Sequence, residues 1–237
     1  MDNREDIREA VLSDLNASST SSLYPEATVN LAINRAYRKI GGLFKWPVLQ
    51  DAQKSLSQKN IEYYDVPSNW RPNSMWRLTV DGVPYGEKPD FSPQTFADYL
   101  NWQDNENADL TDKKWAVQWR RYFINPAPVS AGLVLVVWGY ENVTALSSDS
   151  SETIFTDGMP EGNEAIALEA SAILKKKGEM PQDGNMFSME AKQILIVSFD
   201  KISKEASKYE KINPMLDVPD FFSTGGSANT GRFNITV

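Results

Sequence analysis

Apolar residues recur every three or four positions in two segments near the N-terminus, which is the spacing of amphipathic helices. The first helix is predicted over residues 4–15, after Asn3, whose side chain can accept a hydrogen bond from the first helical turn. The second helix is predicted to begin at Pro25, because proline suits the first position of a helix. Its apolar stripe comprises Val29, Ile33, Ala36, Tyr37 and Ile40.

Two large aromatic residues, Phe44 and Trp46, follow this second helix and are followed in turn by Pro47. Proline has no backbone N–H and pushes the residue before it toward extended backbone, so helix should give way to extended chain here. We expect Phe44 and Trp46 to pack back on the core. Together with Pro47 they form a predicted structural junction, where the chain passes from a helical part to a β-rich part.

The middle of the chain, residues 48–146, has strand composition and alternation, which predicts a β-rich insertion. Asp81-Gly82 marks a hairpin, because a tight turn needs residues that tolerate positive φ. A short helix with Ser92 as its cap is expected to run to Leu100. The strands are predicted over residues 61–66, 75–80, 83–85, 114–124 and 133–140.

Helical periodicity returns after Pro160 and predicts helices over residues 161–177 and 187–211, with a loop at 181–185. The first of these helices is rich in alanine, and small side chains let a neighbouring helix approach closely. The predicted fold class is therefore α+β. A four-helix bundle, formed by residues 1–47 and 147–213, is interrupted by the β-rich insertion of residues 48–146 and followed by an extended C-terminal arm, residues 214–237.

The C-terminal segment, residues 214–237, has few charges and no helical period, and residues 232–237 alternate between polar and apolar like a strand. Such a segment is either a frayed terminus or an arm that crosses onto another chain. Its three phenylalanines favour the arm. The residues expected to bind a partner chain are Phe221, Phe222, Arg232, Phe233, Ile235 and Val237.

The 237 residues include no cysteine and no histidine, which excludes Ser-His-Asp and Cys-His nucleophiles and zinc sites built from thiolate or imidazole. No phosphate-binding loop or calcium loop is complete, and no carboxylate pair stands out as that of a glycosidase. We therefore expect no catalytic residue, no metal, no cofactor and no enzymatic activity. No apolar segment is long enough to span a bilayer and no signal peptide follows Met1, so we expect synthesis in the cytoplasm and no membrane partner.

The formal net charge of −8 argues against a broad nucleic-acid-binding surface, since phosphate binding needs a basic footprint. Three cations, Arg35, Arg38 and Lys39, lie off the apolar stripe of the second helix. They form either a solvated helix face or a contact with an acidic surface of a partner.

The order of these elements resembles the head-to-tail adaptor (connector) proteins of tailed bacteriophages. The resemblance rests on INRAYRKI with the aromatic-Trp-Pro end that follows it, on FINPAP (residues 123–128) before an apolar strand ending in WGYE, and on residues 146–172, which lead back into an alanine-rich helix. It covers about residues 4–211. Gly41-Gly42 and the segment after Pro214 depart from the family pattern.

The resemblance implies a structural virion protein that forms a ring, usually a dodecamer, at the head-to-tail junction. Such a ring docks under the portal protein, carries the tail or nozzle protein and lines the channel through which genomic DNA leaves without specific binding. The protein would be made in the cytoplasm of a bacterial host. The alternative is another tail or baseplate structural protein whose β module contacts proteins or glycans.

Overall fold

The computed structural model describes residues 1–18, 22–87, 91–105, 109, 111–178 and 180–207. Within these ranges the chain forms five α-helices, one short 3-10 helix and two antiparallel sheets, so the predicted α+β class is confirmed. The helices are α1 (Arg4–Asp14), α2 (Glu26–Leu43), α3 (Phe96–Gln103), α4 (Pro160–Lys177) and α5 (Pro181–Ser207).

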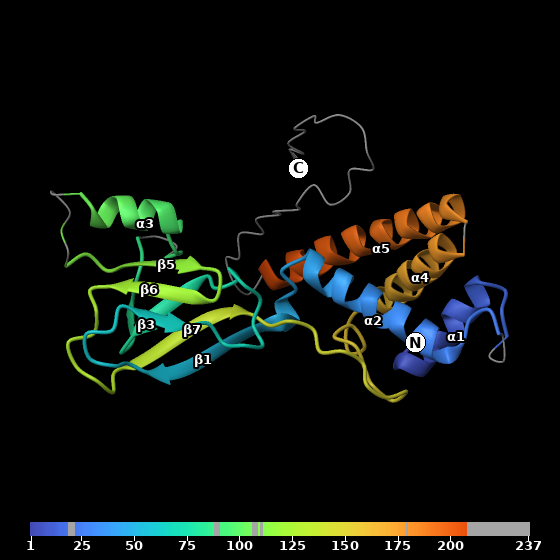
Figure 1. Ribbon diagram of the computed structural model, residues 1–237, viewed down its shortest axis with the longest axis horizontal. Helices are drawn as coiled ribbons and strands as arrows, with labels where there is room; N and C mark the ends of the chain where they lie inside the picture. The colour runs from blue at the N-terminus through green and yellow to red at the C-terminus, as the bar shows by residue number, and fades with distance from the viewer. Residues whose placement is uncertain (19–21, 88–90, 106–108, 110, 179, 208–237) are drawn as a thin grey trace.

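Figure 1 shows an elongated molecule, with α1, α2, α4 and α5 at one end and the two sheets with α3 at the other. We call these parts the helical unit and the β unit. The 3-10 helix η1 (Pro47–Leu49) lies where the chain first passes from one to the other. Each unit has its own cluster of buried apolar side chains.

In the helical unit, α4 packs against α1, α2 and α5, and it is buried along most of its length. Ala165, Ala167, Ala170 and Ala172 are each at most 2 % exposed, so the predicted role of small residues in close helix packing is consistent with this arrangement. Asn3 caps α1 as expected, because its side chain accepts a hydrogen bond from the backbone N–H of Asp6 at 3.0 Å.

The β unit contains a four-stranded sheet in the order β1-β7-β3-β4 and a three-stranded sheet in the order β2-β6-β5. Neighbouring strands are antiparallel in both. Side chains from both sheets share one core that includes the fully buried Trp70 and Trp115. The strands are β1 (Gln50–Leu56), β2 (Tyr63–Asp65), β3 (Arg77–Val80), β4 (Val83–Pro84), β5 (Lys114–Gln118), β6 (Arg121–Asn125) and β7 (Val134–Tyr140).

Several predicted boundaries are wrong. Residues 114–124 are two strands of a hairpin, because the chain reverses at Trp119-Arg120. Residues 181–185 belong to α5, which begins at Pro181, and α3 is capped by Thr95 rather than by Ser92. Strand β1 was not predicted, because its sequence QDAQKSL has no run of alternating apolar residues.

The predicted burial of the two aromatic residues after α2 is confirmed. Trp46 is 1 % exposed and Phe44 is 7 % exposed. The ring of Phe44 stacks on Phe199 of α5 with 4.6 Å between centroids, and Trp46 packs edge-on against Phe155 at 5.0 Å. The indole N–H of Trp46 donates to the carbonyl of Ile40 at 3.1 Å, so its one polar group is satisfied in the core.

Truncation of Trp46 tests how much this aromatic cluster stabilises the fold. We expect Trp46→Ala to lower the free energy of unfolding by about 3–5 kcal/mol, because the indole is buried and its loss leaves a cavity. The matched control is Trp119→Ala, at an indole that is 66 % exposed, which should change stability by only about 0.5 kcal/mol. Urea unfolding followed by circular dichroism measures both. Equal effects of the two substitutions would contradict a supporting role for Trp46.

Candidate functional site

The helical unit and the β unit are joined by the guanidinium of Arg71. Its Nη1 donates to the carbonyl of Phe44 at 2.9 Å, its Nη2 donates to the carbonyl of Gly41, and its Nε donates to the carbonyl of Glu141 at 3.1 Å. Two of these acceptors lie at the C-terminal end of α2, where the helix dipole favours a cation. Burial lowers the pKa of Arg71 from its ordinary value. No local sequence signal predicts this contact.

The close packing at the same junction explains why residue 41 is a glycine. A Cβ atom built at Gly41 would lie 2.5 Å from the side chain of Val143, which follows β7 and crosses the end of α2. Gly41 therefore permits the close passage of the chain that returns from the β unit. At Gly42, by contrast, an added Cβ would meet nothing within 4 Å.

Only two of the three cations predicted to form a basic contact on α2 are exposed and unpaired among the described residues. Arg35 and Arg38 are exposed, and neither forms an ion pair with another described residue. Lys39 instead binds within the chain, with its Nζ 2.6 Å from Oε1 of Glu169 on α4. Leu31 is 53 % exposed on the same side of α2 as Arg35 and Arg38. We define the α2 face as Leu31, Arg35, Arg38 and Gly42.

A second outward surface lies on α5 and was not singled out from the sequence. Four apolar side chains on it are 50–71 % exposed: Met186, Met189, Ile196 and Val197. Glu190 and Gln193 lie among them and are also exposed. We define these six residues as the α5 face. An exposed apolar cluster on a long helix is typical of a surface that contacts another protein.

The two faces lie on different flanks of α4. Along their lengths α2 and α5 pack on α4 rather than on each other. Their buried residues, such as Ile33 and Ala36 on α2 and Ala191 and Leu195 on α5, belong to the core around α4. The exposed residues of the α2 face and the α5 face therefore point away from α4, and the same chain presents both to its surroundings.

The β unit carries one prominent exposed aromatic residue at the hairpin between β5 and β6. Trp119 is 66 % exposed and has φ of +56°, a backbone conformation that bulky side chains rarely adopt. Its backbone N–H donates to Oδ1 of Asn73 at 2.7 Å. Nη1 of the adjacent Arg120 donates to the carbonyls of three residues: Pro67, Ser68 and Trp70. The turn is thus held by hydrogen bonds while the indole faces solvent.

A charged cluster ties the segment before α4 to α1. Asp149 accepts hydrogen bonds from Arg8 Nη1 at 2.8 Å and from Arg4 Nη2 at 2.7 Å, and Arg8 also pairs with Glu26 at 2.9 Å. The hydrogen bonds from Arg8 and then from Arg4 lower the pKa of Asp149 to about 2. This cluster holds α1, the first residue of α2 and the segment before α4 together.

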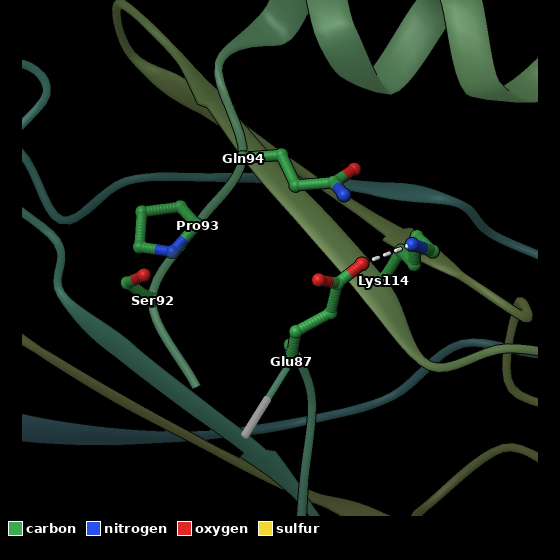
Figure 2. Close-up of a pocket in the computed structure, with 6 residues that line it drawn as sticks. Glu87, Ser92, Pro93, Gln94 and Lys114 are labelled. Carbon is green, nitrogen blue, oxygen red and sulfur yellow. Dashed lines mark hydrogen bonds and ion pairs between the residues drawn. The ribbon is translucent and has the colours of Figure 1, made fainter. Parts of the chain in front are cut away.

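Figure 2 shows a small polar pocket in the β unit, with a volume of about 120 Å³. In it Lys114 pairs with Glu87 at 2.5 Å, and the hydrogen bond from Lys114 lowers the pKa of Glu87. Ligand sites are commonly about 300–1,000 Å³ and mostly apolar, which this pocket is not. The labelled lining residues are Glu87, Ser92, Pro93, Gln94 and Lys114.

Three further features predicted from the sequence concern metal binding, membrane spans and the C-terminal arm. In the described ranges no group of three or more acidic residues is arranged to hold a metal ion. None of the helices there is both long and apolar enough to cross a membrane. The predicted partner-binding residues of the C-terminal arm lie outside the described residues: Phe221, Phe222, Arg232, Phe233, Ile235 and Val237.

Comparison with known protein families found no family model that matches the chain, and comparison with curated proteins found no match.

The depressed pKa of Asp149 gives a pH-dependent prediction. An unfolded aspartate has a pKa of about 3.9, so this carboxylate contributes stability above that pH and loses it as the pH falls toward the folded value of about 2. We expect Asp149→Asn to lower the urea midpoint at neutral pH. The difference from the unsubstituted protein should shrink as the pH falls and vanish only below about 2. A difference that stays constant over this range would contradict the assignment.

Proposed function

We propose that this protein is a structural subunit of the head-to-tail adaptor ring of a tailed bacteriophage. The observation that carries the proposal is the order of the elements: two N-terminal and two C-terminal helices share one core, and the intervening chain forms a separate β unit. This arrangement supports the four-helix bundle with a β-rich insertion that the family resemblance implies. No residue here is proposed to be catalytic.

The contacts of the junction suit a subunit that holds two parts of an assembly together. Arg71 connects the helical unit to the β unit by hydrogen bonds, and the stacking of Phe44 on Phe199 holds the C-terminal end of α2 against α5. The α2 face and the α5 face are available to neighbouring subunits. The C-terminal arm would reach the portal protein, and the β unit would meet the tail or nozzle protein.

The charge of the chain supports passage of DNA rather than binding. A formal net charge of −8 on each copy repels the phosphate backbone, and a ring multiplies that charge. Genomic DNA would therefore move through the channel without a specific contact. A ring that bound duplex DNA tightly at physiological salt would contradict this part of the proposal.

Electron microscopy of the full chain, alone and with the portal protein of the same phage, tests the proposal. We expect a ring of copies at one end of the portal, in the stoichiometry that the portal imposes. Removal of residues 215–237 should weaken docking to the portal and leave the α-helical signal intact, because these residues lie beyond α5. A chain that never joins a portal would contradict the proposal, and unchanged docking of the truncated chain would contradict the arm.

The exposed Trp119 favours a second candidate, a tail or baseplate structural protein whose β unit contacts a glycan or a protein. A backbone that is strained and held in place, with a large side chain left in solvent, is often found where function requires the side chain. Flat aromatic rings stack on sugar rings and are also frequent anchors in protein interfaces.

Binding of soluble host-surface oligosaccharides, measured by calorimetry, tests this second candidate. Binding to the full chain should be lost in Trp119→Ala, because the stacking surface is removed. Binding should be retained in Leu31→Glu, at an exposed residue of the helical unit. The absence of binding to any oligosaccharide, or binding that survives Trp119→Ala, would contradict glycan recognition by this hairpin.

A further inference from the structure

We propose that the α2 face of one copy packs in parallel against the α5 face of the next copy, so that the subunits associate head to tail. The occupant of each face is thus a second copy of this chain. The inference rests on the proposed ring, and it names the two surfaces that would build it. A partner contact at Arg35 and Arg38 was already predicted from the sequence; the α5 face and the pairing of the two faces are new.

The two faces match each other residue by residue. On α2 the exposed positions are 31, 35, 38 and 42, and on α5 they are 186, 190, 193 and 197. Both sets have successive spacings of four, three and four residues, which places each set on one side of its helix. The parallel register pairs Leu31 with Met186, Arg35 with Glu190, Arg38 with Gln193, and Gly42 with Val197.

Each of these pairs is chemically compatible. Leu31 and Met186 are 53 % and 71 % exposed, and their contact would remove both side chains from water. Gly42 has open space where a side chain would lie, and Val197, which is 70 % exposed, can fill it. The flexible Met186 and Met189 adapt readily to a partner surface.

Charge also favours a second copy as the occupant. Arg35 and Arg38 have no ion-pair partner among the described residues, and the same is true of Glu190 on α5. Two other carboxylates of α5, Asp183 and Asp200, are already paired with lysines of their own chain. Copies of a chain with a net charge of −8 repel one another, so a basic helix face offers a favourable place for one copy to meet another.

The directions of the helices are consistent with a ring. Figure 1 shows that α2 and α5 both run toward the β unit. In a ring of many copies, neighbours differ by a small rotation, so α2 of one copy stays nearly parallel to α5 of the next. Two different faces on different flanks of α4 make a heterologous interface, which closes into a ring when the rotation allows it.

Cross-linking tests the pairing, because the chain has no cysteine of its own. In the full chain, Arg35→Cys combined with Glu190→Cys should give a ladder of covalent multimers with a short bis-maleimide. Each single variant should remain monomeric on a denaturing gel. The matched control, Arg35→Cys with Val129→Cys, places the second thiol at a 78 % exposed residue of the β unit and should give no ladder. Dimers from a single variant, or no ladder from the first pair, would overturn the proposal.

Reversing the charges of Arg35 and Glu190 tests, by a separate measurement, whether these two residues lie opposite one another. Arg35→Glu and Glu190→Arg should each weaken association about tenfold in sedimentation velocity, because each places like charges opposite one another. An equimolar mixture of the two variants should restore association, since every interface then joins opposite charges. A mixture as weak as the single variants would contradict the register.

The outcomes separate this inference from the proposed function. Rings on the portal that form without the cross-linked ladder would overturn the α2–α5 pairing and leave the adaptor function standing. A ladder in a protein that never docks on a portal would support the pairing and contradict the adaptor function.

Discussion

The guanidinium of Arg71 is the contact on which the arrangement of the two units depends. It donates to carbonyls at the C-terminal end of α2 and to the carbonyl of Glu141, so it joins the outgoing and returning crossings of the chain. A lysine could not replace it, because one ammonium group cannot match the planar fork that reaches several carbonyls at once. Phe44 packs edge-on against Trp46 and stacks on Phe199, which fixes the end of α2 that supplies two of the acceptors.

The helical unit depends on α4 in a different way. Because α4 is buried along most of its length, α1, α2 and α5 are organised around it, and their outer surfaces are left for other contacts. The small side chains of α4 allow this close packing. An ion pair between α2 and α4, from Lys39 to Glu169, removes a cation that would otherwise enlarge the basic surface of α2.

The sequence predicted the helices and one turn, which depend on neighbouring residues, and missed the contacts between residues far apart in the chain. Periodicity and capping located α1, α2 and α4, and the Asp81-Gly82 turn located its hairpin. The reversal at Trp119-Arg120 was missed because neither residue is a usual turn former, and the alternation continues through it. The partners of Arg71 and Lys39 lie far along the chain, so no window of sequence could reveal them. The α5 face was missed because α5 carries apolar residues on its exposed side as well as on its buried side, and periodicity alone does not separate the two.

The insertion of the β unit between α2 and α4 has a consequence for biosynthesis. The apolar stripe of α2 lacks its main partner, α4, until that helix has left the ribosome, and Lys177 follows Leu43 by 134 positions. At the usual rates of translation this interval is on the order of 7–27 s. All strands of the β unit are made within it, so that unit can fold before the helices close. The nascent chain would then present a folded β unit and an exposed α2, which is the state that a chaperone would meet.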